Sequence, residues 1–235
     1  SRGLGDVYKR QLMYSGAEIY RVEESARRLL HAYGLESPEV FAIPNCLIVS
    51  VATPAGQPVT RMRRVPLHGT DIELLERCNG LCRRLCAEVP PLDEAQALIN
   101  ALPDAIPRYS PRMMLLGYGT APAFFAPLFG GGLGDLACAF LCGLAVGLCL
   151  LYGGKFIGAN SFFRTAVCSA LAAFLSLALV EAGLGESVDV VTISTLMVLV
   201  PGVALTNAMR EIMAGDTFSA LSRTADAILV ASAIA

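Results

Sequence analysis

The sequence predicts an α-helical integral membrane protein, in which a small α+β cytosolic domain precedes a five-span bundle whose last span is truncated. The 235 residues are 54% hydrophobic and only 16% charged, with a mean hydropathy of +0.57, which is too apolar for an ordinary soluble domain. Thirteen of the 18 basic residues lie before Arg112, so a step in charge separates the two parts. Apolar runs of spanning length follow that step.

We divide the chain into residues 1–11, residues 12–110 and residues 111–235. The first eleven, SRGLGDVYKRQ, are similar to a translated sequencing-adapter scar, and they are left out of fold reasoning. Residues 12–110 form the cytosolic domain, and residues 111–235 form the transmembrane bundle. The final run, ADAILVASAIA, stops after roughly a dozen apolar residues where a spanning helix needs about 20, so we expect a fragment at both ends.

The cytosolic domain is expected to contain a helix, a hairpin and two further helices. Ile19, Val22, Ala26 and Leu29 recur at helical spacing between Met13 and Tyr33, and Gly34 is a stop signal. Next, EVFAIPNCLIVSVAT is rich in β-branched residues, PAGQP is typical of a turn, and VTRMRRVP alternates, which predicts a hairpin. Thr70 or Asp71 can cap a helix through DIELLERCNGLCRRLCAEV, and PPLDEAQALINAL opens another helix.

Four apolar runs follow, and a truncated fifth begins near Thr224. Buried helices of a soluble protein are the alternative, but so many in succession with almost no interior charge favour membrane spans. The four runs are Met113 to Phe129, Leu136 to Tyr152, Thr165 to Val180, and Val188 to Met209.

The loop charges predict the orientation of these spans, because Lys and Arg bias a loop to the cytoplasm. The connections GGGLGD and EAGLGESVD carry only acids. The N-terminal domain is therefore expected inside, with successive loops outside, inside, outside and inside. The basic residues that flank the cytoplasmic connections are Arg108, Arg112, Lys155, Arg164, Arg210 and Arg223.

The fourth run is interrupted by Pro201 and Gly202, within VLVPGVALTNAMREIMAGD. In lipid, irregular backbone persists only where protein or a water-filled cavity surrounds it. A packed proline kink would explain the pair as well. Thr206 and Asn207 lie just beyond the break and supply donors and acceptors to a polar substrate, and transporters place binding sites at such discontinuous helices.

Acids at the ends of spans are the candidates for proton or substrate coupling. They are Asp135, Glu181, Asp189 and Asp226, of which Glu181 and Asp189 fit ordinary loop acids. A local helix pair with Arg223 would explain Asp226 without transport. The sequence has no G-x-x-x-x-G-K-[ST] loop, which favours secondary transport over ATP hydrolysis.

Other classes of site find little support in the sequence. Cys78, Cys82 and Cys86 share a helical face but lack C-x-x-C spacing and a nearby His, so we expect no metal. The glycines of FGGGLGD do not fit a dinucleotide fingerprint, and we expect close helix packing there and no cofactor. No catalytic signature suggests an enzyme, and no basic cluster interleaved with aromatics suggests nucleic acid. The remaining cysteines of the apolar runs, Cys138, Cys142, Cys149 and Cys168, are expected to act as small hydrophobes.

Three segments together resemble the threonine/serine exporter family. LVPGVALTNAMREIMAGDTFSALSR is similar to the family's hallmark segment, SGAEIYRVEESARRLLHAYG to its opening helix, and LFGGGLGD to its glycine-rich turn. Glu211 stands where the family often has Asp, so the charge is retained. The resemblance implies a cytosolic domain and a five-span bundle in a bacterial cytoplasmic (inner) membrane, exporting small amino acids or, in the split form, dicarboxylates such as succinate. In that form a second five-span subunit completes the exporter.

Two functions remain open from the sequence. The first is a subunit of a secondary exporter, with lipid, a second membrane subunit and a small polar substrate as partners. The second is a membrane-anchored regulatory or interaction protein without transport activity, and the Pro-Gly break favours the first. Glu18, Arg21 and Glu23 of the first helix are expected only to solvate a face. The substrate pathway is predicted at Pro201, Gly202, Thr206, Asn207, Arg210, Asp226 and Asp135.

Overall fold

The computed structural model describes residues 18–35, 38–52, 57–64, 71–102, 105, 109–153 and 161–235. Its contacts divide the chain into a first unit of Ser1–Pro107 with Val203–Thr224 and a second unit of Arg108–Gly202 with Ala225–Ala235. The division after Pro107 lies close to the predicted boundary at residue 110, whereas Val203–Thr224 groups with the N-terminal residues. The start of the first predicted helix, most of the PAGQP turn, Thr70, Arg108 and Lys155 lie outside the described residues.

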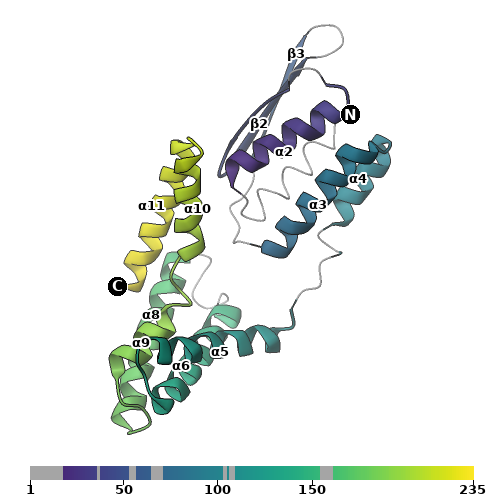
Figure 1. Cartoon of the computed structure of the whole chain (residues 1–235). Coiled ribbons are helices and arrows are strands. Elements are labelled where there is room, and N and C mark those ends of the chain that lie inside the picture. Colours follow the sequence, from purple (N-terminus) through teal and green to yellow (C-terminus); the bar gives the residue numbers. More distant parts are fainter. Residues whose placement is uncertain are drawn as a thin grey trace. The chain divides into compact units, whose positions relative to one another are not determined.

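The first unit contains the predicted order of helix, β-structure, helix and helix. In Figure 1, α2 lies along the strands and α3 lies beside α4. Two further helices, α10 and the first part of α11, belong to this unit by contacts. The elements are α2 (Ile19–Ala32), β1 (Glu39–Ile43), β2 (Cys46–Ala52), β3 (Pro58–Arg64), α3 (Ile72–Glu88), α4 (Leu92–Ala101), α10 (Gly202–Met213) and α11 (Thr217–Ile234).

The predicted hairpin is a three-stranded antiparallel sheet in the order β1-β2-β3. The first predicted strand is divided by a turn at Pro44 and Asn45, and Ile43 pairs with Cys46 directly across it. Proline suits a turn because its φ is preset and it has no N–H to donate to the ladder, and asparagine is a common turn residue. The prediction of a single strand through these residues was therefore wrong.

One apolar face of α2 forms the core of the first unit together with the sheet and α3. Ile19, Val22, Ala26 and Leu29 are all buried, as their helical spacing predicts. The helix ends at the predicted position, where Gly34 takes a φ of +76° that glycine adopts without strain. Asp71 caps α3 by accepting a hydrogen bond of 2.9 Å from the Leu74 N–H.

The polar face of α2 also binds the free edge of the sheet. The Ala42 N–H of β1 donates to Glu23 Oε1 at 2.8 Å, and Arg27 Nη2 donates to the Val40 carbonyl at 3.3 Å. An unpaired strand edge is a site for aggregation, and these side chains satisfy part of it. The expectation that Glu23 only solvates a face was wrong.

The second unit consists of helices over the predicted apolar runs. The fourth run forms two helices, of which α9 belongs to this unit and α10 to the first. The elements are α5 (Pro111–Leu128), α6 (Leu133–Tyr152), α8 (Ser161–Glu181), α9 (Val188–Leu196) and the end of α11.

Small side chains fill the interior of the second unit, while large apolar side chains lie outside. Ala126, Cys138, Ala139, Cys142 and Cys168 are buried, so the cysteines act as small hydrophobes as predicted. Leu133 is 87% exposed and Phe124 is 76% exposed. The buried hydroxyls of Ser176 and Thr195 donate to carbonyls one turn back, at 2.7 and 2.8 Å. This arrangement is the reverse of a soluble core and is typical of helices packed in lipid.

Two of the described helices are long and apolar enough to cross a membrane. They are Leu133–Tyr152, with a mean hydropathy of 2.1, and Phe162–Glu181, with 1.9. In their most apolar windows only 39% and 28% of the residues are buried, so most of this apolar surface lies outside the packed interior. A membrane bundle is consistent with these helices, and its five-span form stays a prediction.

Close approach of α5 and α6 depends on glycine. A Cβ on Gly143 would clash with the Tyr118 carbonyl oxygen, and one on Gly147 would lie 2.6 Å from Tyr118 Cβ. In the glycine-rich turn, a Cβ on Gly134 would meet the Leu184 carbonyl at 2.7 Å, so close packing is confirmed there. Gly130 serves a different purpose, because its φ is +87°.

We expect Gly143→Ala to destabilise the second unit by about 1–3 kcal/mol, because the added methyl group overpacks the α5–α6 contact. Gly117→Ala on α5 is the matched control, since nothing lies within 4 Å of its Cβ position. Thermal unfolding of the detergent-purified protein, followed by size exclusion, measures both. Equal melting temperatures for the two variants would contradict the close approach at Gly143.

Candidate functional site at the helix break

The predicted interruption at Pro201 and Gly202 is confirmed. Helix α9 ends at Leu196 and α10 begins at Gly202, and between them the backbone forms short-range turns. The Leu199 N–H donates to the Leu196 carbonyl at 2.8 Å, and the Gly202 N–H donates to the Val200 carbonyl at 2.8 Å. Proline lacks the N–H that would continue α9, so the chain leaves the helix and starts a new one.

Polar residues follow the break at helical spacing on α10. Asn207 and Glu211 are four residues apart and therefore share a face, as do Thr206 and Arg210. Asn207 is half-buried and Glu211 is fully buried, whereas Thr206 and Arg210 are exposed. The first face points into the interior of the first unit, and the second lies at its surface.

The buried carboxylate of Glu211 contacts two other helices, α2 and α11. Its Oε1 accepts a hydrogen bond from the Ile19 N–H of α2 at 3.3 Å and another from Arg223 Nε of α11 at 2.8 Å. Ile19 is the first residue of α2, where an N–H has no partner within its own helix. Glu211 thus provides a hydrogen-bond acceptor for the N-terminus of α2, although 192 residues of sequence separate Glu211 from Ile19.

Glu18 forms a second connection beside the first. Its side chain is buried, and its two oxygens accept from Arg21 Nε at 2.7 Å and from Arg210 Nη1 at 2.9 Å. Both carboxylates, Glu18 and Glu211, lie at the N-terminus of α2, where the helix dipole stabilises negative charge. The expectation that Glu18 only solvates a face was wrong, whereas Arg21 is exposed and forms an i,i+3 pair with it, as expected.

One side of Glu211 is unsatisfied among the described residues. Its Oε2 and the hydroxyl of Ser219 are both buried without a hydrogen-bond partner there. Ser219 lies one turn before Arg223 on α11, so it shares the helix face that contacts Glu211. Burying a carboxylate with only one oxygen paired is costly, which is unusual for a position with a merely structural role.

Burial raises the pKa of Glu211 above its ordinary value, although the charge of Arg223 and the Ile19 N–H act in the opposite direction. The folded protein therefore binds a proton at Glu211 more readily than the unfolded chain does. The contribution of this group to stability is present at low pH and is lost as the pH rises through the raised pKa.

Asp135 holds a loop in the second unit. Its Oδ1 accepts hydrogen bonds from the Glu186 N–H at 2.7 Å and the Ser187 N–H at 3.0 Å, and its Oδ2 accepts from the Gly132 N–H at 3.3 Å. These three bonds connect the start of α6 to the loop before α9. They account for the burial of Asp135 structurally, and its role in coupling stays a prediction.

Asp226 is exposed on the part of α11 that belongs to the second unit. Arg223 forms an ion pair with Glu211 at 2.8 Å. The helix pair with Arg223 that would explain Asp226 without transport stays a prediction. Among the predicted residues, Pro201, Gly202, Thr206, Asn207 and Arg210 lie together at the break and on α10. Sequence reasoning missed Glu18, Ser219 and the burial of Glu211, and the retained charge at Glu211 was the one signal pointing to it.

Comparison with known proteins places these residues in a family. The sequence model described as "Putative threonine/serine exporter" matches residues 10–235. The protein named "Threonine/serine exporter" from Corynebacterium glutamicum is 24% identical over 98% of this chain and 47% of its own length. The "Probable threonine/serine exporter" of Mycobacterium tuberculosis is 25% identical over 100% of this chain and 46% of its own.

A longer fungal protein is also similar to this chain. "Pheromone-regulated membrane protein 10" of Debaryomyces hansenii is 27% identical over 87% of this chain and 21% of its own length. The chain thus spans about half or less of the length of these curated relatives. No solved structure matches it. The family match over residues 10–235, which includes the helix break and the residues around Glu211, shows that the chain belongs to the threonine/serine exporter family.

Proposed function

We propose that the chain is a subunit of a secondary exporter that moves small polar metabolites out of the cell. Threonine and serine are the first substrates to test, because relatives that the chain matches are named for them. Small dicarboxylates such as succinate are the second substrates to test, because the sequence also resembles the split exporters. The observation that carries the proposal is the helix break at Pro201 and Gly202, followed by a polar face that includes Asn207 and Glu211.

The helix break and the buried carboxylate support transport, because each of them destabilises the fold and is therefore expected to serve a function. A broken helix leaves carbonyls without partners, and a buried carboxylate with a free oxygen is expensive in any protein. Transporters use both features, since freed backbone groups and polar side chains bind substrates at discontinuous helices. A protein that only anchors a domain has no use for either.

The proposal includes a second membrane subunit and a bacterial inner-membrane location. The chain covers 46% and 47% of the lengths of the two exporters it matches, which leaves room for another half of similar size. We place the N-terminal domain in the cytosol because the retained Lys and Arg of alternate loops favour that side. The substrate pathway is proposed along Pro201, Gly202, Thr206, Asn207 and Arg210, with Asp135 and Asp226 as the weaker members.

Reporter fusions test the proposed topology. A fusion after Gly158 should be cytoplasmic, giving fluorescent-protein signal, and one after Gly185 should be external, giving alkaline phosphatase activity. The physical reason is that Lys155 and Arg164 flank the first loop, whereas acids alone occupy the second. Both reporters giving the same side would rule out the alternating arrangement.

Substitution of Asn207 tests the proposed pathway. We expect Asn207→Leu to lower the initial rate of export at least about tenfold, because loss of about 1.4 kcal/mol from one hydrogen bond to substrate has that effect. Export of threonine, serine and succinate would be measured in cells that express the complete protein with its companion subunit, at matched membrane abundance. Pro201→Ala should also impair export, since it removes the break while improving the helix.

Met209→Leu is the matched control, because it places the same side chain on an exposed position of α10. Its export should stay within twofold of the wild type. Export by Asn207→Leu at the wild-type rate would favour the packed-kink interpretation, and with it the membrane-anchored regulatory protein.

A further inference from the structure

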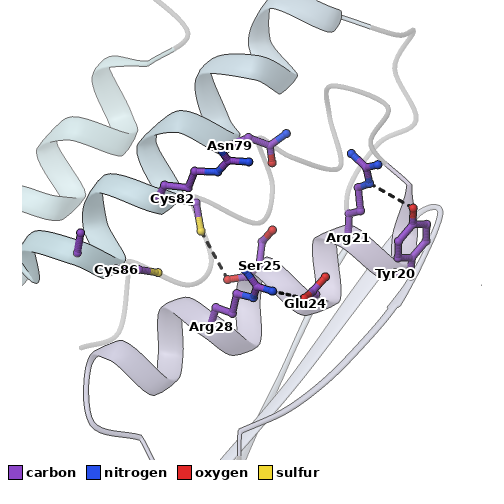
Figure 2. A pocket seen from close by; sticks show the side chains of 10 residues that line it. Tyr20, Arg21, Glu24, Ser25, Arg28, Asn79, Cys82 and Cys86 are labelled. Atoms are coloured by element: carbon purple, nitrogen blue, oxygen red, sulfur yellow. Dashed lines mark hydrogen bonds and ion pairs between the residues drawn. The ribbon is translucent and has the colours of Figure 1, made fainter.

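A basic cavity lies within the first unit, between α2 and α3. Its volume is about 690 Å³, which is in the range of pockets for small ligands. Figure 2 shows the α2 side chains of Tyr20, Arg21 and Arg28 on one wall and Asn79 and Cys82 of α3 on the other. All these residues belong to the same unit, so the cavity is complete without the membrane helices.

The lining carries more positive than negative charge. Arg21, Arg28 and Arg83 contribute three guanidinium groups, and Glu24 contributes one carboxylate. The Cys82 thiol donates to the Ser25 carbonyl at 3.7 Å and adds no charge. Burial raises the pKa of the Cys86 thiol to about 11, so this group also stays neutral in the cell.

Arg83 differs from every other arginine on the two helices. Arg21, Arg27, Arg28, Arg77 and Arg84 each form an ion pair with a glutamate three or four residues away. The positions four residues before and after Arg83 hold Asn79 and Ala87, which are uncharged. In the part of the chain that the structure describes, Arg83 has no acidic partner, and it lies on the cavity wall.

We infer that this cavity binds a small oxyanion, a carboxylate or phosphate compound, with Arg83 as its principal ligand. A guanidinium group presents paired N–H donors that match the two oxygens of either anion. Arg21 and Arg28 add positive charge, and the Asn79 amide and the Tyr20 and Ser25 hydroxyls provide neutral donors. None of the lining residues belongs to the proposed substrate pathway, but Arg21 shares the carboxylate of Glu18 with Arg210 of that pathway. On the proposed function, the site would report a metabolite level to the exporter.

Calorimetric titration of the purified whole chain in lipid nanodiscs tests this site. Succinate and inorganic phosphate are the two probes, in a buffer without either anion, and succinamide is the uncharged control. We expect at least one anion to bind and succinamide not to bind. Which anion binds more tightly distinguishes a carboxylate from a phosphate ligand.

Two variants with opposite designs locate the site. Arg83→Gln removes the guanidinium group and should weaken binding at least about tenfold. Asn79→Glu keeps Arg83 but places an acid four residues before it, so that Arg83 can form an i,i+4 ion pair like the other arginines. This pair would compete with the anion and should weaken binding similarly. It should leave the melting temperature equal or higher. Arg84→Gln is the matched control on the same helix, and its affinity should stay within twofold because Arg84 lies outside the cavity.

Several results would overturn the inference. These are no binding of either anion to the wild type, equal binding of succinamide, equal losses in Arg83→Gln and Arg84→Gln, or full affinity in Asn79→Glu. Each is independent of export, because the titration measures binding in a protein that need not transport.

Discussion

The buried carboxylate of Glu211 is the constraint on which the arrangement of the first unit depends. A charge taken out of water is costly unless it is paired, and removing one partner of such a pair typically costs about 3–5 kcal/mol. Glu211 is 0% exposed and has two donors, the Ile19 N–H and Arg223 Nε. Satisfying this one group therefore holds the start of α2, the helix after the break and the following helix in a single arrangement. Glu18 strengthens the same junction through Arg210.

The two units differ in which side chains fill their interiors. In the first unit, Leu29, Leu47, Leu85 and Ile99 lie inside, so burial of large apolar side chains stabilises the fold. In the second unit the buried side chains are mostly small, such as Ala139, Cys142 and Ser176, together with Val146 and Val191, and many large apolar side chains are exposed. Lipid provides no hydrophobic force between helices, so close approach at residues such as Gly143 replaces it.

Local patterns in the sequence predicted local structure well. The helical spacing from Ile19 to Leu29, the stop at Gly34, the cap at Asp71 and the break at Pro201 all depend on neighbouring residues, and all are confirmed. The division of the first strand at Pro44 and Asn45 was missed because β-branched residues continue on both sides of the turn.

The candidate site could be predicted only in part, because its polar groups are paired through the fold. Asn207 and Arg210 follow the break in sequence, and a polar stretch after Pro-Gly is visible without a structure. One partner of Glu211 is a backbone N–H 192 residues away, and no local pattern predicts such a contact. The same holds for Asp135, whose partners Glu186 and Ser187 lie in a distant loop. Burial of a charge is decided by tertiary packing, and sequence periodicity does not report it.

Amide hydrogen exchange at the start of α2 tests most directly whether Glu211 holds this junction. The account predicts that Glu211→Ala accelerates exchange in the peptide containing Ile19 by roughly 10- to 100-fold, as loss of a hydrogen bond to a charged group implies. Exchange in β2, in the core of the same unit, should stay unchanged, which would exclude global unfolding. Glu211→Gln keeps an acceptor oxygen and should give an intermediate rate. Wild-type exchange at Ile19 in the alanine variant would contradict the claim that Glu211 holds α2 to the segment after the helix break.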